Sequence, residues 1–175
     1  KIIEQFGADS VRLFILSDSP PEKDVQWSED GMNSSYKFIL KLWVLNQKIL
    51  EEIKSDNPEN SDNSIEKISN QFVKNVSDNI NNFSYNKIIA NFHEMYAALN
   101  KIILKKISKK KIIENYKKIL IAMNPVIPHF SNECLETIGE RQQIFWPEIN
   151  MEVLVEKKKN FIIQINGKTR EIIKA

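Results

Sequence analysis

Residues 36–50 read YKFILKLWVLNQKIL, and this run decides the fold class. Its apolar side chains recur every three or four residues, which is the spacing of one face of an α-helix. The pattern extends from Met32 to about Lys54 and predicts a long amphipathic helix capped by Ser28. The side chains expected to face the core are Tyr36, Ile39, Leu40, Trp43, Val44, Gln47 and Leu50.

Other segments on both sides of this helix share the helical spacing. They are residues 7–17, 65–83, 85–103, 109–123 and 129–138. Asp9 and Ser108 are the predicted N-caps of the first and fourth of these segments, since short polar side chains accept the free amides of a first turn. Pro128 suits the first turn of the last segment, and Gly139 ends it. These features predict an antiparallel helical bundle.

The last thirty residues have a different pattern. Two β-rich runs, 161–165 and 168–173, are joined by Asn166-Gly167, which is a strong hairpin signal. We therefore expect a mainly α fold in three parts. Residues 1–31 form a linker with a short helix and an extended piece, residues 32–145 form the bundle, and residues 146–175 hold the first β-hairpin of a small α/β domain.

Composition excludes several classes of protein. One cysteine and two histidines give no disulfide framework and no zinc site, and four glycines form no phosphate-binding loop. No apolar run approaches the roughly 20 residues that cross a bilayer, and residues 1–6 have neither the basic-then-apolar order nor the cleavage site of a signal peptide. A cytoplasmic location fits best. Because the chain does not begin with Met, we expect it to be a piece of a longer protein.

The sequence offers no catalytic grouping. His129 at a helix start is more typical of a hydrogen-bonded structural histidine, and Cys134 is typical of a packed side chain. Residues 101–118 hold eight lysines against Glu114 alone, whereas residues 51–66 hold six acids against Lys54. The lysine run fits either a phosphate-attracting patch or a solvated surface, and the acidic run predicts that nucleic acid approaches one face only.

Several strings of the sequence resemble one enzyme family. Residues 6–16 read FGADSVRLFIL and residues 19–24 read SPPEKD, followed by Trp27 and Ser28. Later, residues 124–129 read NPVIPH and residues 164–170 read QINGKTR. Together these strings span nearly the whole chain, and they closely resemble leucyl-tRNA synthetases of class I, in the region after the catalytic domain. The SPPEKD string favours this family over the valyl- and isoleucyl-tRNA synthetases, which share the bundle.

The resemblance implies a parent enzyme that joins leucine to its tRNA with ATP and Mg, and that edits mischarged tRNA in an inserted domain. Those parts, and hence the catalytic residues, are expected upstream of Lys1, so this segment alone is expected to be catalytically inactive and to hold no cofactor or metal. The resemblance further implies a monomer whose helical domain is of the anticodon-binding type. Its partner is tRNA(Leu), held by sugar and phosphate contacts more than by base contacts.

The resemblance also indicates which cations face the tRNA. The candidate tRNA-binding residues lie in the matching linker, the first bundle helix and the hairpin: Arg12, Lys23, Lys37, Lys41, Lys168 and Arg170. A structural role for Arg12, bracing Asp9 or a neighbouring helix, is equally compatible with its position. An alternative from another class is a helical protein-interaction module that binds no RNA.

Overall fold

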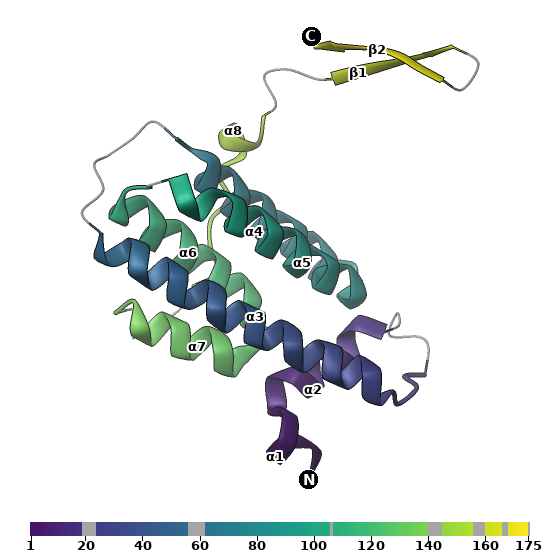
Figure 1. Ribbon diagram of the computed structural model, residues 1–175, viewed down its shortest axis with the longest axis vertical. Helices are drawn as coiled ribbons and strands as arrows, with labels where there is room; N and C mark the ends of the chain where they lie inside the picture. The colour runs from purple at the N-terminus through teal and green to yellow at the C-terminus, as the bar shows by residue number, and fades with distance from the viewer. Residues whose placement is uncertain are drawn as a thin grey trace.

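The computed structural model describes residues 1–18, 24–55, 62–105, 107–139, 145–155, 160–165 and 168–174. For Asp18, Leu104 and the residues after 159 it describes the backbone alone. Helices dominate the described part of the chain (Figure 1). Their bounds are α1 Ile2–Phe6, α2 Ala8–Asp18, α3 Glu29–Lys54, α4 Ser64–Asn81, α5 Tyr85–Ile102, α6 Lys109–Met123, α7 Pro128–Thr137 and α8 Met151–Leu154.

The mainly α fold is confirmed, and the helices α2 to α7 pack around one core. Helix α4 lies along α5 and α6, and α2 lies against both α3 and α5 (Figure 1). The core is aliphatic with a few aromatic rings, for example Phe72 and Phe92, whose centroids are 5.5 Å apart. Leu13 of α2 belongs to the same cluster as the bundle side chains, so the core does not divide at residue 31. The division of the chain into three domains stays a prediction.

The helix bounds agree with the sequence patterns at most ends. Ser28 caps α3 as predicted, because its Oγ accepts a hydrogen bond from the Gly31 amide at 3.1 Å. Ser108 is at the N-cap position of α6, but its side chain makes no capping bond. Gly139 follows α7 with φ of 88°, a left-handed conformation that glycine adopts without strain. The short helices α1 and α8 and the 3-10 turn Ile103–Lys105 were not predicted, since three to five residues carry no readable periodicity.

The buried stripe of α3 is rotated from the predicted one. Leu40 and Val44 were expected in the core, yet they are 44% and 57% exposed. Residues 38–45 read FILKLWVL, so apolar side chains cover most of the circumference and fit more than one rotation of the helix. Packing against α2 and α6 selects the rotation. The buried side chains are Met32, Ser35, Phe38, Ile39, Leu42, Leu45, Asn46 and Ile49.

Beyond α8, two strands pair antiparallel. They are β1 Asn160–Ile165 and β2 Lys168–Lys174, and the register shifts between Ile163 and Gln164 (Figure 1). The predicted turn at Asn166-Gly167 lies outside the described residues. None of the described helices is long and apolar enough to cross a membrane.

Candidate nucleic-acid interface

The exposed side of α3 brings two of the predicted tRNA-binding lysines together. Lys37 and Lys41 lie one helical turn apart and are both exposed, and Lys48 follows two turns later. Leu40 and Val44 lie between them on the same side. We call these five residues the α3 outer face. No acidic residue of α3 occurs between Lys37 and Lys48, while Glu133 of α7 lines a hollow together with Leu40.

Arg12 is placed differently from these lysines. Its Nε donates to the Val126 carbonyl at 2.9 Å, and one terminal nitrogen donates to the Pro125 carbonyl at 2.7 Å. Both acceptors lie in the turn between α6 and α7, where proline and the helix end leave carbonyls without amide partners. Arg12 thus braces a neighbouring turn, which is one of the two roles that its sequence position allowed.

Asp9 corrects a sequence prediction. Instead of capping its own helix, it lies inside α2, and its carboxylate caps α7: it accepts from the Phe130 amide at 2.7 Å and the His129 amide at 3.3 Å. The residue before α7 is Ile127, which has no side-chain acceptor, so a distant carboxylate serves those amides. His129 Nδ1 also lies 2.9 Å from Asp9, which makes this histidine part of the cap.

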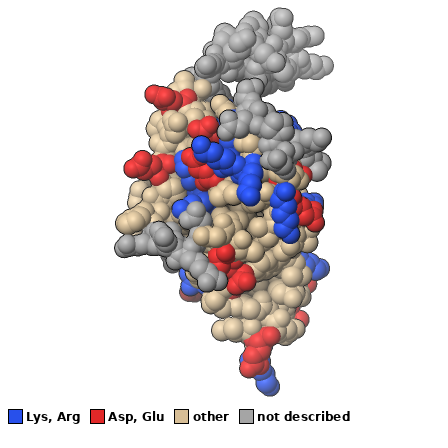
Figure 2. All heavy atoms as spheres, turned by 90° about the vertical axis from the view of Figure 1, so that its left-hand side faces the viewer, with Lys and Arg blue, Asp and Glu red and all other residues tan. Residues whose placement is uncertain are grey.

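Two lysines of residues 101–118, a range that we call the basic segment, contact the described end of the acidic run. Lys105 Nζ is 3.6 Å from an Asp62 carboxylate oxygen, and Lys111 Nζ donates to Asn63 Oδ1 at 3.0 Å. Figure 2 shows lysine and carboxylate side chains interspersed on the face where α3 ends and α6 begins. Lysines of the basic segment thus lie against part of the acidic run, and the expectation that nucleic acid approaches one face only stays a prediction.

The structure does not describe the side chains of the other three predicted tRNA-binding residues. Lys23 lies outside the described residues, and the side chains of Lys168 and Arg170 on β2 are not described. Of the predicted tRNA-binding residues, the described side chains therefore bring Lys37 and Lys41 together on the α3 outer face, and their role in binding stays a prediction.

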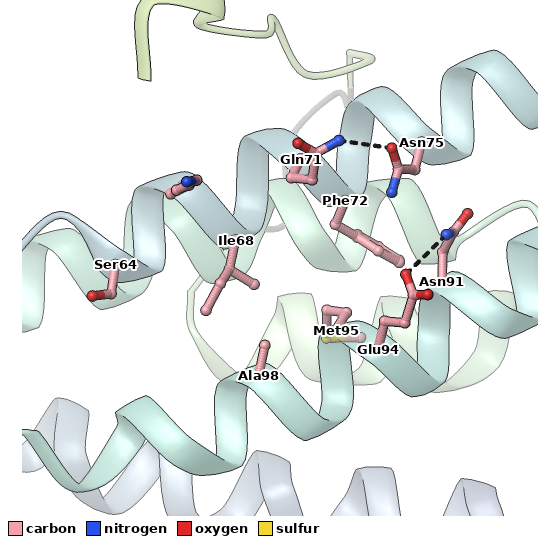
Figure 3. A pocket seen from close by; sticks show the side chains of 10 residues that line it. Ser64, Ile68, Gln71, Phe72, Asn75, Asn91, Glu94, Met95 and Ala98 are labelled. Carbon is pink, nitrogen blue, oxygen red and sulfur yellow. Dashed lines mark hydrogen bonds between the residues drawn. The ribbon is translucent and has the colours of Figure 1, made fainter. Parts of the chain in front are cut away.

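A cavity of about 330 Å³ lies between α4 and α5. Ile68, Phe72 and Met95 form its apolar floor, and amides line its rim (Figure 3). Gln71 donates to Asn75 at 2.8 Å, and Asn91 donates to Glu94 at 3.3 Å. Lys67 and Glu94 are the charged residues among those that line it, and Ser64 adds a hydroxyl. Neither histidine nor cysteine is among the lining residues.

The buried environment of Cys134 disfavours a reactive thiolate in the core of the bundle. The side chain is buried, and burial raises the pKa of the Cys134 thiol to about 12. Tyr116 lies beside it, and burial also raises the pKa of the Tyr116 phenol. Within the described ranges, no group of three His, Cys, Asp or Glu side chains could hold a metal ion.

His93 is a polar residue of this region that the sequence did not single out. Its ring lies on that of Phe38, with centroids 3.9 Å apart and planes inclined by 34°. The pKa of His93 is lowered first by burial of one side of the ring and then by the positive charge of Lys41. No local pattern marks this residue, because the contact joins α3 to α5 across more than fifty residues.

Comparisons with known proteins agree with this fold. A family model described as the anticodon-binding domain of tRNA ligase matches residues 62–175. The chain is 31% identical to a leucine–tRNA ligase of Fusobacterium nucleatum and 34% identical to one of Wolbachia pipientis, over 97% and 99% of its length. It spans 22% of the length of each of these relatives.

A solved structure shares the fold. It is the LeuRS of Agrobacterium radiobacter K84, in a ternary complex with tRNA and LeuAMS, with a TM-score of 0.83 and 20% identity. The match covers 99% of this chain and 24% of the other. The resemblance to leucyl-tRNA synthetases found in the sequence is confirmed, and the chain belongs to the family of anticodon-binding domains of tRNA ligases.

Proposed function

We propose that this chain is the tRNA-positioning part of a leucine–tRNA ligase. The observation that carries the proposal is the 31–34% identity to leucine–tRNA ligases over nearly the whole chain. The parent protein would join leucine to tRNA(Leu) with ATP and Mg in a catalytic domain outside these residues, and would edit mischarged tRNA in another. The part proposed for this chain is to hold the tRNA while its acceptor end reaches those domains.

The α3 outer face is the proposed contact surface within the bundle. Ammonium groups of Lys37 and Lys41 would neutralise phosphates, and Leu40 and Val44 on the same side of the helix would pack against ribose. Arg12 would act indirectly by holding the α6–α7 turn. Lys23, Lys168 and Arg170 stay candidate contacts, the last two on a hairpin that would begin a small C-terminal α/β domain.

The rest of the proposed context follows from the same family. The protein would act as a monomer in the cytoplasm, with tRNA(Leu) as its nucleic-acid partner. Contacts to phosphate and sugar at the α3 outer face would favour recognition of tRNA shape over reading of bases.

Binding of the chain to tRNA(Leu), and to a tRNA with a different arm architecture, tests the proposal. Each titration is made across a salt series, because release of counterions makes the slope of log K against log salt report the number of phosphate contacts. A preference for tRNA(Leu) that survives moderate salt is the expected result. Absence of binding even at low salt would contradict the proposal and favour a protein-interaction module.

A pair of double variants locates the surface. Lys37→Gln with Lys41→Gln is expected to weaken binding about tenfold and to reduce the salt slope by about two. Lys105→Gln with Lys111→Gln removes the same number of charges from the basic segment and is the matched control, with an expected change in affinity below about threefold.

A further inference from the structure

The His93 ring lies on the ring of Phe38, at the edge of the α3 outer face. Phe38, the residue beneath its ring, is 5% exposed and belongs to the core. A second aromatic contact, between Phe38 and Tyr96 at 5.8 Å, fixes the same floor from α5. The His93 side chain itself stays exposed, so its ring edge is accessible to a ligand.

Lys41 is the charged neighbour of His93. It lies three residues from Phe38 on α3, and its charge lowers the pKa of the imidazole. No described carboxylate is among the groups that shift the His93 pKa. The charge of Lys41 thus acts on the His93 imidazole, and no described carboxylate offsets its effect on the pKa of that ring.

Charged groups on the other helices around α5 are turned elsewhere. Glu94 of α5 and Lys67 of α4 line the cavity between those two helices. From α2, Asp9 is held by α7, and Arg12 is held by the carbonyls of residues 125 and 126. Among the described side chains, Lys41 is therefore the charge that governs His93.

We infer that His93 and Lys41 together bind one phosphate of the RNA backbone. The inference rests on the proposed function. A protonated imidazole donates from both ring nitrogens, and the ammonium of Lys41 supplies a second charge. The negative charge of a phosphate between them offsets the positive charge of Lys41 and so raises the pKa of His93. Binding of the phosphate is therefore coupled to uptake of a proton by the imidazole. Affinity for RNA consequently rises as the pH falls through the range in which His93 titrates.

The first experiment measures tRNA(Leu) affinity at constant salt between about pH 7.5 and about pH 5.5. The chain with native residues is expected to bind about threefold to tenfold more tightly at the lower pH. His93→Gln is expected to abolish this dependence. His129→Gln is the matched control, because it removes the other histidine, and it should keep the dependence. Dependence that persists in His93→Gln overturns the inference.

The second experiment follows the His93 ring proton by NMR in the native chain, which avoids any effect of substitution on folding. The pKa of His93 is expected to rise when tRNA(Leu) binds, and to rise in the free chain when Lys41→Gln removes the neighbouring charge. An unchanged pKa on normal binding overturns the inference but leaves the proposed function standing. Absence of tRNA binding by the native chain overturns both.

Discussion

The α3 outer face and the basic segment both concentrate lysine, yet their surroundings differ. On α3, the described carboxylates form no ion pair with Lys37 or Lys41, and the charge of Lys41 acts on the imidazole of His93. In the basic segment, Lys105 and Lys111 contact the acidic loop at Asp62 and Asn63. At least one lysine of the basic segment is thus paired with a described carboxylate, whereas Lys37 and Lys41 are not. A count of charges along the sequence does not report the surface potential, because the fold decides which opposite charges meet.

Reversing the charges on the α3 outer face is expected to have the largest effect on tRNA binding. Lys37→Glu with Lys41→Glu should lower tRNA affinity by at least about a hundredfold at low salt, since two attractions become two repulsions. Lys109→Glu with Lys110→Glu, on exposed positions of α6, serves as the control and should cost less than about fivefold. Equilibrium binding by filter retention or fluorescence measures both. A larger loss in the α6 variant would transfer the interface to the basic segment.

Arg12 differs from both groups of lysines, because its guanidinium donates to backbone carbonyls. Arg12→Ala should lower the free energy of unfolding by about 1–2 kcal/mol, because two backbone carbonyls of the α6–α7 turn lose a charged donor. Chemical denaturation monitored by circular dichroism measures the loss. Arg12→Lys, which keeps the charge but not the planar fork, should recover only part of it. Full stability in Arg12→Ala together with a reduced salt slope would make Arg12 a tRNA contact instead.

The basic segment has a smaller expected effect on stability. Lys105→Gln with Lys111→Gln should lower the free energy of unfolding by about 0.5–1 kcal/mol, as exposed ion pairs contribute little. The loss should shrink in high salt, which screens the pair with Asp62. Thermal unfolding at two ionic strengths checks this. A loss that is independent of salt would show that the lysine stems, not their charges, hold the loop.

The apolar part of the α3 outer face should have the smallest effect. Leu40→Ala and Val44→Ala should each change the free energy of unfolding by less than about 0.5 kcal/mol, because both side chains are already largely exposed. Leu42→Ala, at 2% exposure, is the matched core variant and should cost about 2–5 kcal/mol. Comparable losses at Leu40 and Leu42 would mean that the helix is rotated toward the stripe read from the sequence.

The sequence predicted the helices well and their contacts poorly, for a physical reason. Helix ends depend on neighbouring residues, so Ser28, Pro128 and Gly139 could be assigned from local chemistry. The rotation of α3 could not, because an almost wholly apolar run fits several rotations and only packing against other helices selects one. The partner of Asp9 was missed for the same reason.

The candidate site shows the same limit. Lys37 and Lys41 were identified through a family resemblance, and their spacing places them on one side of a helix. His93 carries no such signal, since its neighbours Phe38 and Lys41 come from another helix. Pairing of the lysine and acidic runs also depends on the path of the chain through space, which charge patterning along the sequence does not contain.

The cap that Asp9 supplies to α7 spans 121 residues of sequence. During synthesis, α2 leaves the ribosome long before α7. The hydrogen bonds of Asp9 and Arg12 can therefore form only after residues 125–130 have been made. Closing so long a loop is an entropic cost that only the assembled core offsets. We therefore expect the bundle to complete folding late, in one step, when α7 binds to α2.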